Sequence, residues 1–117
     1  MPQVILAVGI KPYALKLFDE LGTDNYLIIV CKTKAKDAGM NDDYFLNTFT
    51  YIEANPERFD SVSQDILRIL SLCNPPREKV DILIMDDFDQ DGVDENNLFA
   101  RYKDLLKEDG TTLFIAL

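Results

Sequence analysis

The residues best able to do chemistry lie together in one acidic segment. From Asp86 to Glu95 the sequence Asp-Asp-Phe-Asp-Gln-Asp-Gly-Val-Asp-Glu places six carboxylates in ten residues. Carboxylates can transfer protons, bind cations or attract a basic partner. They can also form a solvated acidic turn that stabilises the start of a following helix. Because the chain has no histidine, histidine-based hydrolase triads are excluded, and catalysis would depend on carboxylates, Lys, Tyr or Cys.

The spacing within this segment predicts a divalent cation site for Ca²⁺ or Mg²⁺. Three alternating carboxylates can converge on one ion, Gly92 permits a sharp turn, and a later carboxylate can approach through water. The pattern is similar to the Asp-x-Asp-x-Asp-Gly loop of EF-hands, but Leu98 stands where that loop has its bidentate Glu. A complete EF-hand is therefore not expected. The candidate metal ligands are Asp87, Asp89, Asp91 and Glu95.

The elements that would position these residues alternate between strands and helices. Apolar or β-branched runs predict strands at Val4–Val8, Tyr26–Cys31, Phe49–Ile52, Val80–Met85 and Thr111–Leu117. Helical spacing predicts helices over 12–21, from Ser61 until Pro75-Pro76 stops the second helix, and over 98–106. Ser61 and Gln64 form a capping-box pattern at the start of the second helix. At 117 residues, the chain is expected to be a single α/β domain, residues 1–117.

This alternation predicts a fold class: a three-layer, Rossmann-like α/β sandwich with about five mostly parallel strands. Ligands of such sheets bind beyond the carboxyl ends of the strands. Gly9, Lys11 and Glu53 follow or end predicted strands, so they are the candidate cofactor-binding residues. Asp86 follows the most clearly patterned strand and brings the acidic segment to the same edge.

The C-terminal third also resembles a known family. From Val80 to Leu117 it is similar to the fourth strand, following helix and fifth strand of spermidine synthase-like proteins, a branch of the class I S-adenosylmethionine-dependent methyltransferases. The matching residues are Asp86-Asp87-Phe88-Asp89, Asp91-Gly92-Val93, Leu98-Phe99, Tyr102 through Leu106, and Asp109-Gly110 before Thr112-Leu113-Phe114-Ile115. The resemblance implies that Asp86 acts on an amine nucleophile, that Asp89 helps to hold a polyamine, and that the cofactor is of the S-adenosylmethionine type.

The upstream half departs from that pattern. The family has a glycine-rich loop after its first strand and an acidic residue at the end of its second, whereas this chain has Gly9 alone and then Cys31-Lys32. We therefore expect a non-catalytic binding or regulatory module acting through protein contacts. The alternatives are a small aminopropyl- or methyltransferase-like enzyme using Asp86 and Asp89, and a Toprim-like Mg²⁺-dependent phosphotransfer enzyme suggested by Asp87 to Gly92.

Charge and composition limit the partners and the compartment. The 21 acidic and 12 basic residues give a net charge of −9, which disfavours nucleic acid and suits a basic protein partner. Self-association is the other expectation, because an exposed edge strand after Thr111 could pair in a dimer. No apolar run is long enough to span a membrane, and no secretory signal is seen, so a cytoplasmic protein is expected. Cys31 and Cys73 are expected to be buried thiols.

Overall fold

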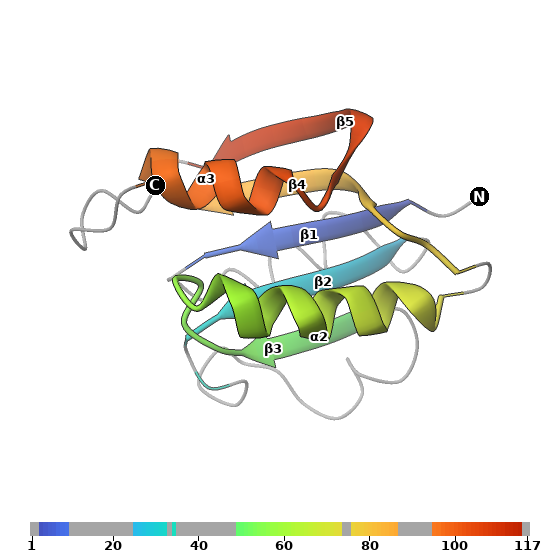
Figure 1. The fold of residues 1–117 in the computed structure, drawn as a ribbon, viewed down its shortest axis with the longest axis horizontal. Helices are drawn as coiled ribbons and strands as arrows, with labels where there is room; N and C mark the ends of the chain where they lie inside the picture. Colours follow the sequence, from blue (N-terminus) through green and yellow to red (C-terminus); the bar gives the residue numbers. More distant parts are fainter. Residues whose placement is uncertain are drawn as a thin grey trace.

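The computed structural model describes residues 3–9, 25–32, 34, 49–73, 76–86 and 95–115. Strands and helices alternate along the described chain (Figure 1). The elements are β1 (Val4–Val8), β2 (Tyr26–Cys31), β3 (Phe49–Glu53), α2 (Phe59–Ser71), β4 (Val80–Asp86), α3 (Glu95–Lys103) and β5 (Leu106–Ile115). The helix predicted over 12–21 lies outside the described residues.

The described strands form one parallel sheet in the order β3-β2-β1-β4-β5. This order matches the first five positions of the Rossmann arrangement, in which the chain builds one half of the sheet and then returns to build the other. The predicted α/β class and parallel sheet are confirmed. β1 lies at the centre, with Ala7 opposite Ile29 on one side and Ile84 on the other.

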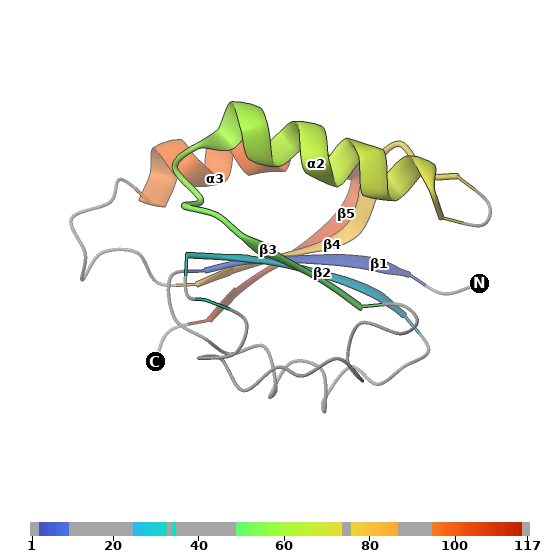
Figure 2. The ribbon, with the colours of Figure 1, turned by 90° about the horizontal axis from the view of Figure 1, so that it is seen from below.

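Both faces of the central strands are shielded from solvent. Every residue of β1 is buried, which explains why its sequence is continuously apolar rather than alternating. The two described helices lie on one face of the sheet (Figure 2). Alternate strand residues point toward these helices and belong to the main hydrophobic cluster. Examples are Leu6, Val30 and Leu83. Ile5 and Ile29 alternate with these residues and are also buried, so the opposite face is covered as well.

Helix α2 is amphipathic and packs on the sheet through Val62, Ile66 and Leu70. These residues are four positions apart, so they form one stripe along the helix. The predicted capping box is wrong, because the helix begins at Phe59 and its N-cap, Arg58, has no side-chain cap. Ser61 lies within the first turn, where its hydroxyl donates to the Arg58 carbonyl at 3.4 Å.

The boundaries of α3 and β5 also differ from the prediction. Helix α3 ends at Lys103, and the Leu105 N–H donates to the Tyr102 carbonyl at 3.0 Å in the turn that follows. Leu106 then starts β5 opposite Val80, and the register shifts before Thr111 pairs with Ile82. The final strand therefore begins five residues earlier than predicted. A bulge accommodates the polar segment whose composition is typical of a loop.

Asp81 contacts three segments of the chain at the amino edge of the sheet. Its Oδ2 accepts the Val4 N–H at 2.8 Å and lies 3.3 Å from Nη1 of Arg77, while its Oδ1 lies 2.7 Å from Nζ of Lys107. Burial raises the pKa of the Asp81 carboxyl, but the Lys107 and Val4 hydrogen bonds and the charges of Lys107 and Arg77 outweigh burial and lower it. This ionised carboxylate therefore joins the start of β1 to the bulge of β5.

Candidate functional site at the carboxyl edge of the sheet

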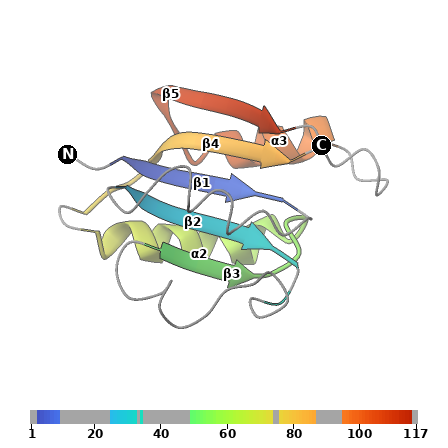
Figure 3. The same ribbon diagram turned by 180° about the vertical axis from the view of Figure 1, so that it is seen from behind.

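All five described strands point the same way, so their carboxyl ends meet at one edge (Figure 3). The chain order reverses at β1, with β2 and β3 on one side and β4 and β5 on the other. In open α/β sheets this reversal leaves a crevice outside the strand ends, where ligands bind. Here the reversal lies between β1 and β4, which are neighbours in the sheet.

Asp86 is the last residue of β4 and lies at this reversal. It follows Met85, which pairs with Val8, and Gly9 follows Val8 in the same register. The predicted catalytic Asp86 and the predicted cofactor residue Gly9 therefore lie at neighbouring strand ends. Asp89, the other predicted catalytic residue, lies outside the described residues.

Gly9 has a defined role in the sheet. Its N–H donates to the Val30 carbonyl at 3.0 Å, which extends the pairing of β1 with β2 beyond Val8. A ligand acceptor at this position would have to compete with that hydrogen bond for the N–H. Lys11, the next predicted cofactor residue, lies outside the described residues.

Glu53 ends β3 at the same edge but away from Asp86. It is exposed and stands opposite Cys31 in the register. Three strand spacings separate β3 from β4, which is about 14 Å at the usual spacing between neighbouring strands. The backbone positions of Glu53 and Asp86 are therefore far enough apart that a ligand contacting both residues would have to be extended.

Cys31, Tyr51 and Glu53 form a cluster that sequence analysis did not identify. Burial raises the pKa of the Tyr51 phenol, and a side-chain hydrogen bond with Cys31 and the nearby Cys31 and Glu53 groups raise it further. The phenol therefore stays protonated and can only exchange hydrogen bonds near neutral pH. Pairing two predicted parallel strands in the correct register would have revealed the cluster, but the sequence does not specify that register.

The predicted metal site can be located only in part. Glu95 begins α3, whereas Asp87, Asp89 and Asp91 lie outside the described residues. Within the described part of the chain, no group of three or more Cys, Asp or Glu side chains is placed to hold a metal ion. The Ca²⁺ or Mg²⁺ site in the acidic segment stays a prediction.

A buried tyrosine fixes the segment that follows β3. The Tyr102 hydroxyl, from α3, donates to the Pro56 carbonyl at 2.7 Å, and its ring meets Phe59 edge-on with centroids 5.0 Å apart. Burial raises the pKa of Tyr102, so its hydroxyl remains a donor. The contact holds the loop after Glu53 against α3, which limits movement at this end of the edge.

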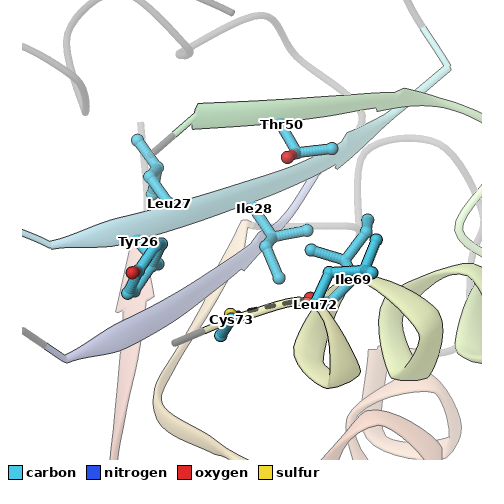
Figure 4. Close-up of a pocket in the computed structure, with 7 residues that line it drawn as sticks. All are labelled: Tyr26, Leu27, Ile28, Thr50, Ile69, Leu72 and Cys73. Carbon is cyan, nitrogen blue, oxygen red and sulfur yellow. Dashed lines mark hydrogen bonds between the residues drawn. The ribbon is translucent and has the colours of Figure 1, made fainter. Parts of the chain in front are cut away.

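A concave feature lies at the opposite, amino edge. A pocket of about 200 Å³ opens between the starts of β2 and β3 and the last turn of α2 (Figure 4). Its lining residues are Tyr26, Leu27, Ile28, Thr50, Ile69, Leu72 and Cys73. Sequence analysis did not predict this pocket, because it arises where the end of a helix meets two strands that are distant in sequence.

Comparison with known proteins gives no assignment: no family model matches the chain, and no curated protein matches it. Neither helix of the described segments is long and apolar enough to cross a membrane.

Proposed function

We propose that the protein is a non-catalytic binding or regulatory module that holds a basic segment of a partner protein at the carboxyl edge of its sheet. The observation that carries the proposal is the position of Asp86, which ends β4 beside Gly9 where the strand order reverses. In the sequence, four further Asp and one Glu follow within nine residues.

Net charge supports a cationic partner. A chain of charge −9 attracts basic surfaces over several ångströms and repels nucleic-acid backbones. A divalent cation held by Asp87, Asp89, Asp91 and Glu95 is part of this proposal, since the same carboxylates attract either kind of positive charge. Cys31 and Cys73 are both free thiols, which supports a reducing, cytoplasmic compartment.

Two features of the carboxyl edge support binding without catalysis. The Gly9 N–H is hydrogen-bonded to Val30, and β2 ends in a buried cysteine followed by an exposed lysine. The resemblance to spermidine synthase-like proteins implies a glycine-rich loop at the first position and an acidic residue at the second. Because both features are replaced in this chain, their replacement supports a methyltransferase-like framework that makes protein contacts without catalysis.

The proposal is tested by titrating the isotopically labelled protein and following its backbone amides by NMR. The probes are a short Lys- and Arg-rich peptide, Ca²⁺, Mg²⁺, S-adenosylmethionine and its aminopropyl-donor form. The peptide is expected to shift the amides of Gly9 and Asp86 more than those of the amino edge. Asp86→Asn should weaken peptide binding by up to about fivefold, the effect of one charge at a solvated interface.

Asp104→Asn is the matched control. It removes the same charge from an exposed residue in the turn between α3 and β5, at the amino edge. Equal weakening by the two variants would mean non-specific attraction and would refute the proposed site. Peptide shifts spread evenly over the surface would refute it too.

A second function, that of a small aminopropyl- or methyltransferase-like enzyme, is favoured by one observation. Glu53 stands opposite Cys31, so an acidic side chain lies beside the end of β2 although it comes from β3. Saturable shifts at Gly9 and Glu53 with either adenosyl ligand would support the enzyme and reject the leading proposal. The Toprim-like alternative has weaker support, because β1 ends in Val8 and Gly9 without a Glu.

A further inference from the structure

The pocket at the amino edge runs from an exposed mouth to a floor within the core. Leu72, just beyond the end of α2, is 79% exposed, whereas Ile28 is 1% exposed and Cys73 is 8% exposed. Figure 4 shows Ile28 reaching from β2 toward Ile69 and Leu72 at the end of the helix. The pocket therefore penetrates between helix and sheet instead of lying flat on the surface.

The sequence leaves this space open at Thr50. On β3, Thr50 and Ile52 alternate with Tyr51, and Ile52 packs against the main hydrophobic cluster. Thr50 has a shorter side chain than Ile52, so it does not fill the corresponding space under the last turn of α2. Its hydroxyl adds a hydrogen-bonding group to an otherwise mostly apolar wall.

No described lining residue carries a formal charge. The polar groups are the Thr50 hydroxyl, the Tyr26 phenol and the Cys73 thiol. The Cys73 Sγ–H donates to the Ile69 carbonyl at 3.5 Å. Burial raises the pKa of Cys73 more than the Arg77 charge lowers it, so the thiol stays neutral. Arg77 is already paired with Asp81 at 3.3 Å, so a charged ligand would lose its hydration here without gaining an ionic partner among the described lining residues.

We propose that this pocket binds a small uncharged ligand, an aromatic ring or short alkyl chain with a single hydroxyl group. Its volume of about 200 Å³ exceeds the roughly 150 Å³ of an apolar cavity that accepts benzene. The apolar part would contact Ile28 and Ile69, and the hydroxyl would hydrogen-bond to Thr50. The pocket lies at the opposite end of the sheet from Asp86, so this inference does not depend on the proposed function.

The test compares phenol and 1-hexanol with hexanoate, whose chain matches that of hexanol but carries a charge. Methyl-resolved NMR of the full chain is expected to show saturable shifts at Ile28, Ile69 and Leu72 with both uncharged probes. Hexanoate should bind at least about tenfold more weakly, because its carboxylate finds no partner in the described wall. Equal binding of hexanol and hexanoate, or shifts that do not saturate, would overturn the proposal.

Thr50→Ile tests the same space by filling it, and Thr111→Ile on the exposed part of β5 is the matched control. The Thr50→Ile substitution should weaken phenol binding at least about tenfold and leave the melting temperature unchanged or higher. The Thr111→Ile control should bind phenol as the wild type does. Undiminished binding to a folded Thr50→Ile protein would overturn the proposal.

A measurement on the wild-type protein keeps the proposal falsifiable if Thr50→Ile does not fold. Phenol should slow alkylation of Cys73 more than that of Cys31, which is 1% exposed in the sheet. Equal effects on both thiols would indicate global stabilisation and would also overturn the pocket assignment.

Discussion

Replacing Asp81 with Asn should destabilise the fold, because the substitution removes the negative charge of this side chain. The carboxyl is 12% exposed and contacts the Val4 N–H, Arg77 and Lys107 at 2.8, 3.3 and 2.7 Å. Asn keeps the shape and one acceptor oxygen, so the Val4 bond can persist while the two ionic contacts are lost. Hydrogen bonds to charged groups contribute about 1.5 to 3 kcal/mol each when buried. Because Lys107 is 42% exposed, solvent screening reduces the sum, and we expect a loss of about 2 kcal/mol.

A loss of that size corresponds to a fall of about 8 °C in melting temperature for a domain of this length. Thermal unfolding followed by circular dichroism measures it. Asp109→Asn is the control, because Asp109 lies 3.8 Å from the same lysine but is 86% exposed. The control should change the free energy of unfolding by less than about 0.5 kcal/mol. An Asp81→Asn protein as stable as the control would refute the assigned role of Asp81.

The pH dependence gives a second check on Asp81. Its pKa is lower in the folded protein than in the unfolded chain, so the unfolded state binds its proton more readily. The contribution is therefore complete above the unfolded value of about 3.9 and is lost as pH falls through the folded value. The stability gap between wild type and Asp81→Asn should be constant near neutral pH and close only in acid. A gap that widens in acid would refute the ionic explanation.

Two other substitutions test contacts that shape the carboxyl edge and the bulge. Tyr102→Phe leaves the buried Pro56 carbonyl without its 2.7 Å hydrogen bond, so urea unfolding should show a loss of about 1 to 2 kcal/mol; a loss below about 0.5 kcal/mol would contradict that role. Gly110→Ala would place a Cβ 2.9 Å from the Asp81 carbonyl oxygen and 2.5 Å from Cδ1 of Leu106, so the bulge must shift. The same assay should show a loss of about 1 to 3 kcal/mol, and an unchanged midpoint would mean that the bulge adapts freely.

Continuous apolar runs predicted the strands well because parallel strands are buried on both faces. β1 and β2 have the predicted bounds, and β3 and β4 extend only one residue further. Boundaries set by tertiary contacts were harder to predict. α3 ends at Lys103 because Leu106 pairs with Val80, a long-range contact that has no local signal in a stretch with helical spacing.

The sequence predicts the candidate site as far as the site depends on which residues end the strands. It does not predict which of those residues are neighbours, because that depends on how the strands are ordered and paired. Knowing that Gly9, Glu53 and Asp86 follow or end parallel strands is enough to place them at one edge. Which of them are neighbours depends on strand order: Gly9 lies beside Asp86, while Glu53 lies beside Cys31. The sequence alone suggested Gly9, Lys11 and Glu53 as cofactor-binding residues. Two strand spacings, about 10 Å, separate the ends of β1 and β3, so a ligand that contacts both Gly9 and Glu53 would have to be extended.

An acidic residue stands at each edge of the sheet, Asp81 at the amino edge and Asp86 at the carboxyl edge. At the amino edge, Asp81 has three partners within 3.3 Å, and its charge stabilises the joining of β1, β4 and β5. At the carboxyl edge, Asp86 begins a run of carboxylates whose nearest basic residues in sequence are Lys79 and Arg101. Carboxylates close together repel one another, which costs stability unless a cation or basic segment offsets the repulsion. Under the proposed function, a bound basic segment would offset this repulsion, so the peptide that shifts the Asp86 amide should also raise the melting temperature.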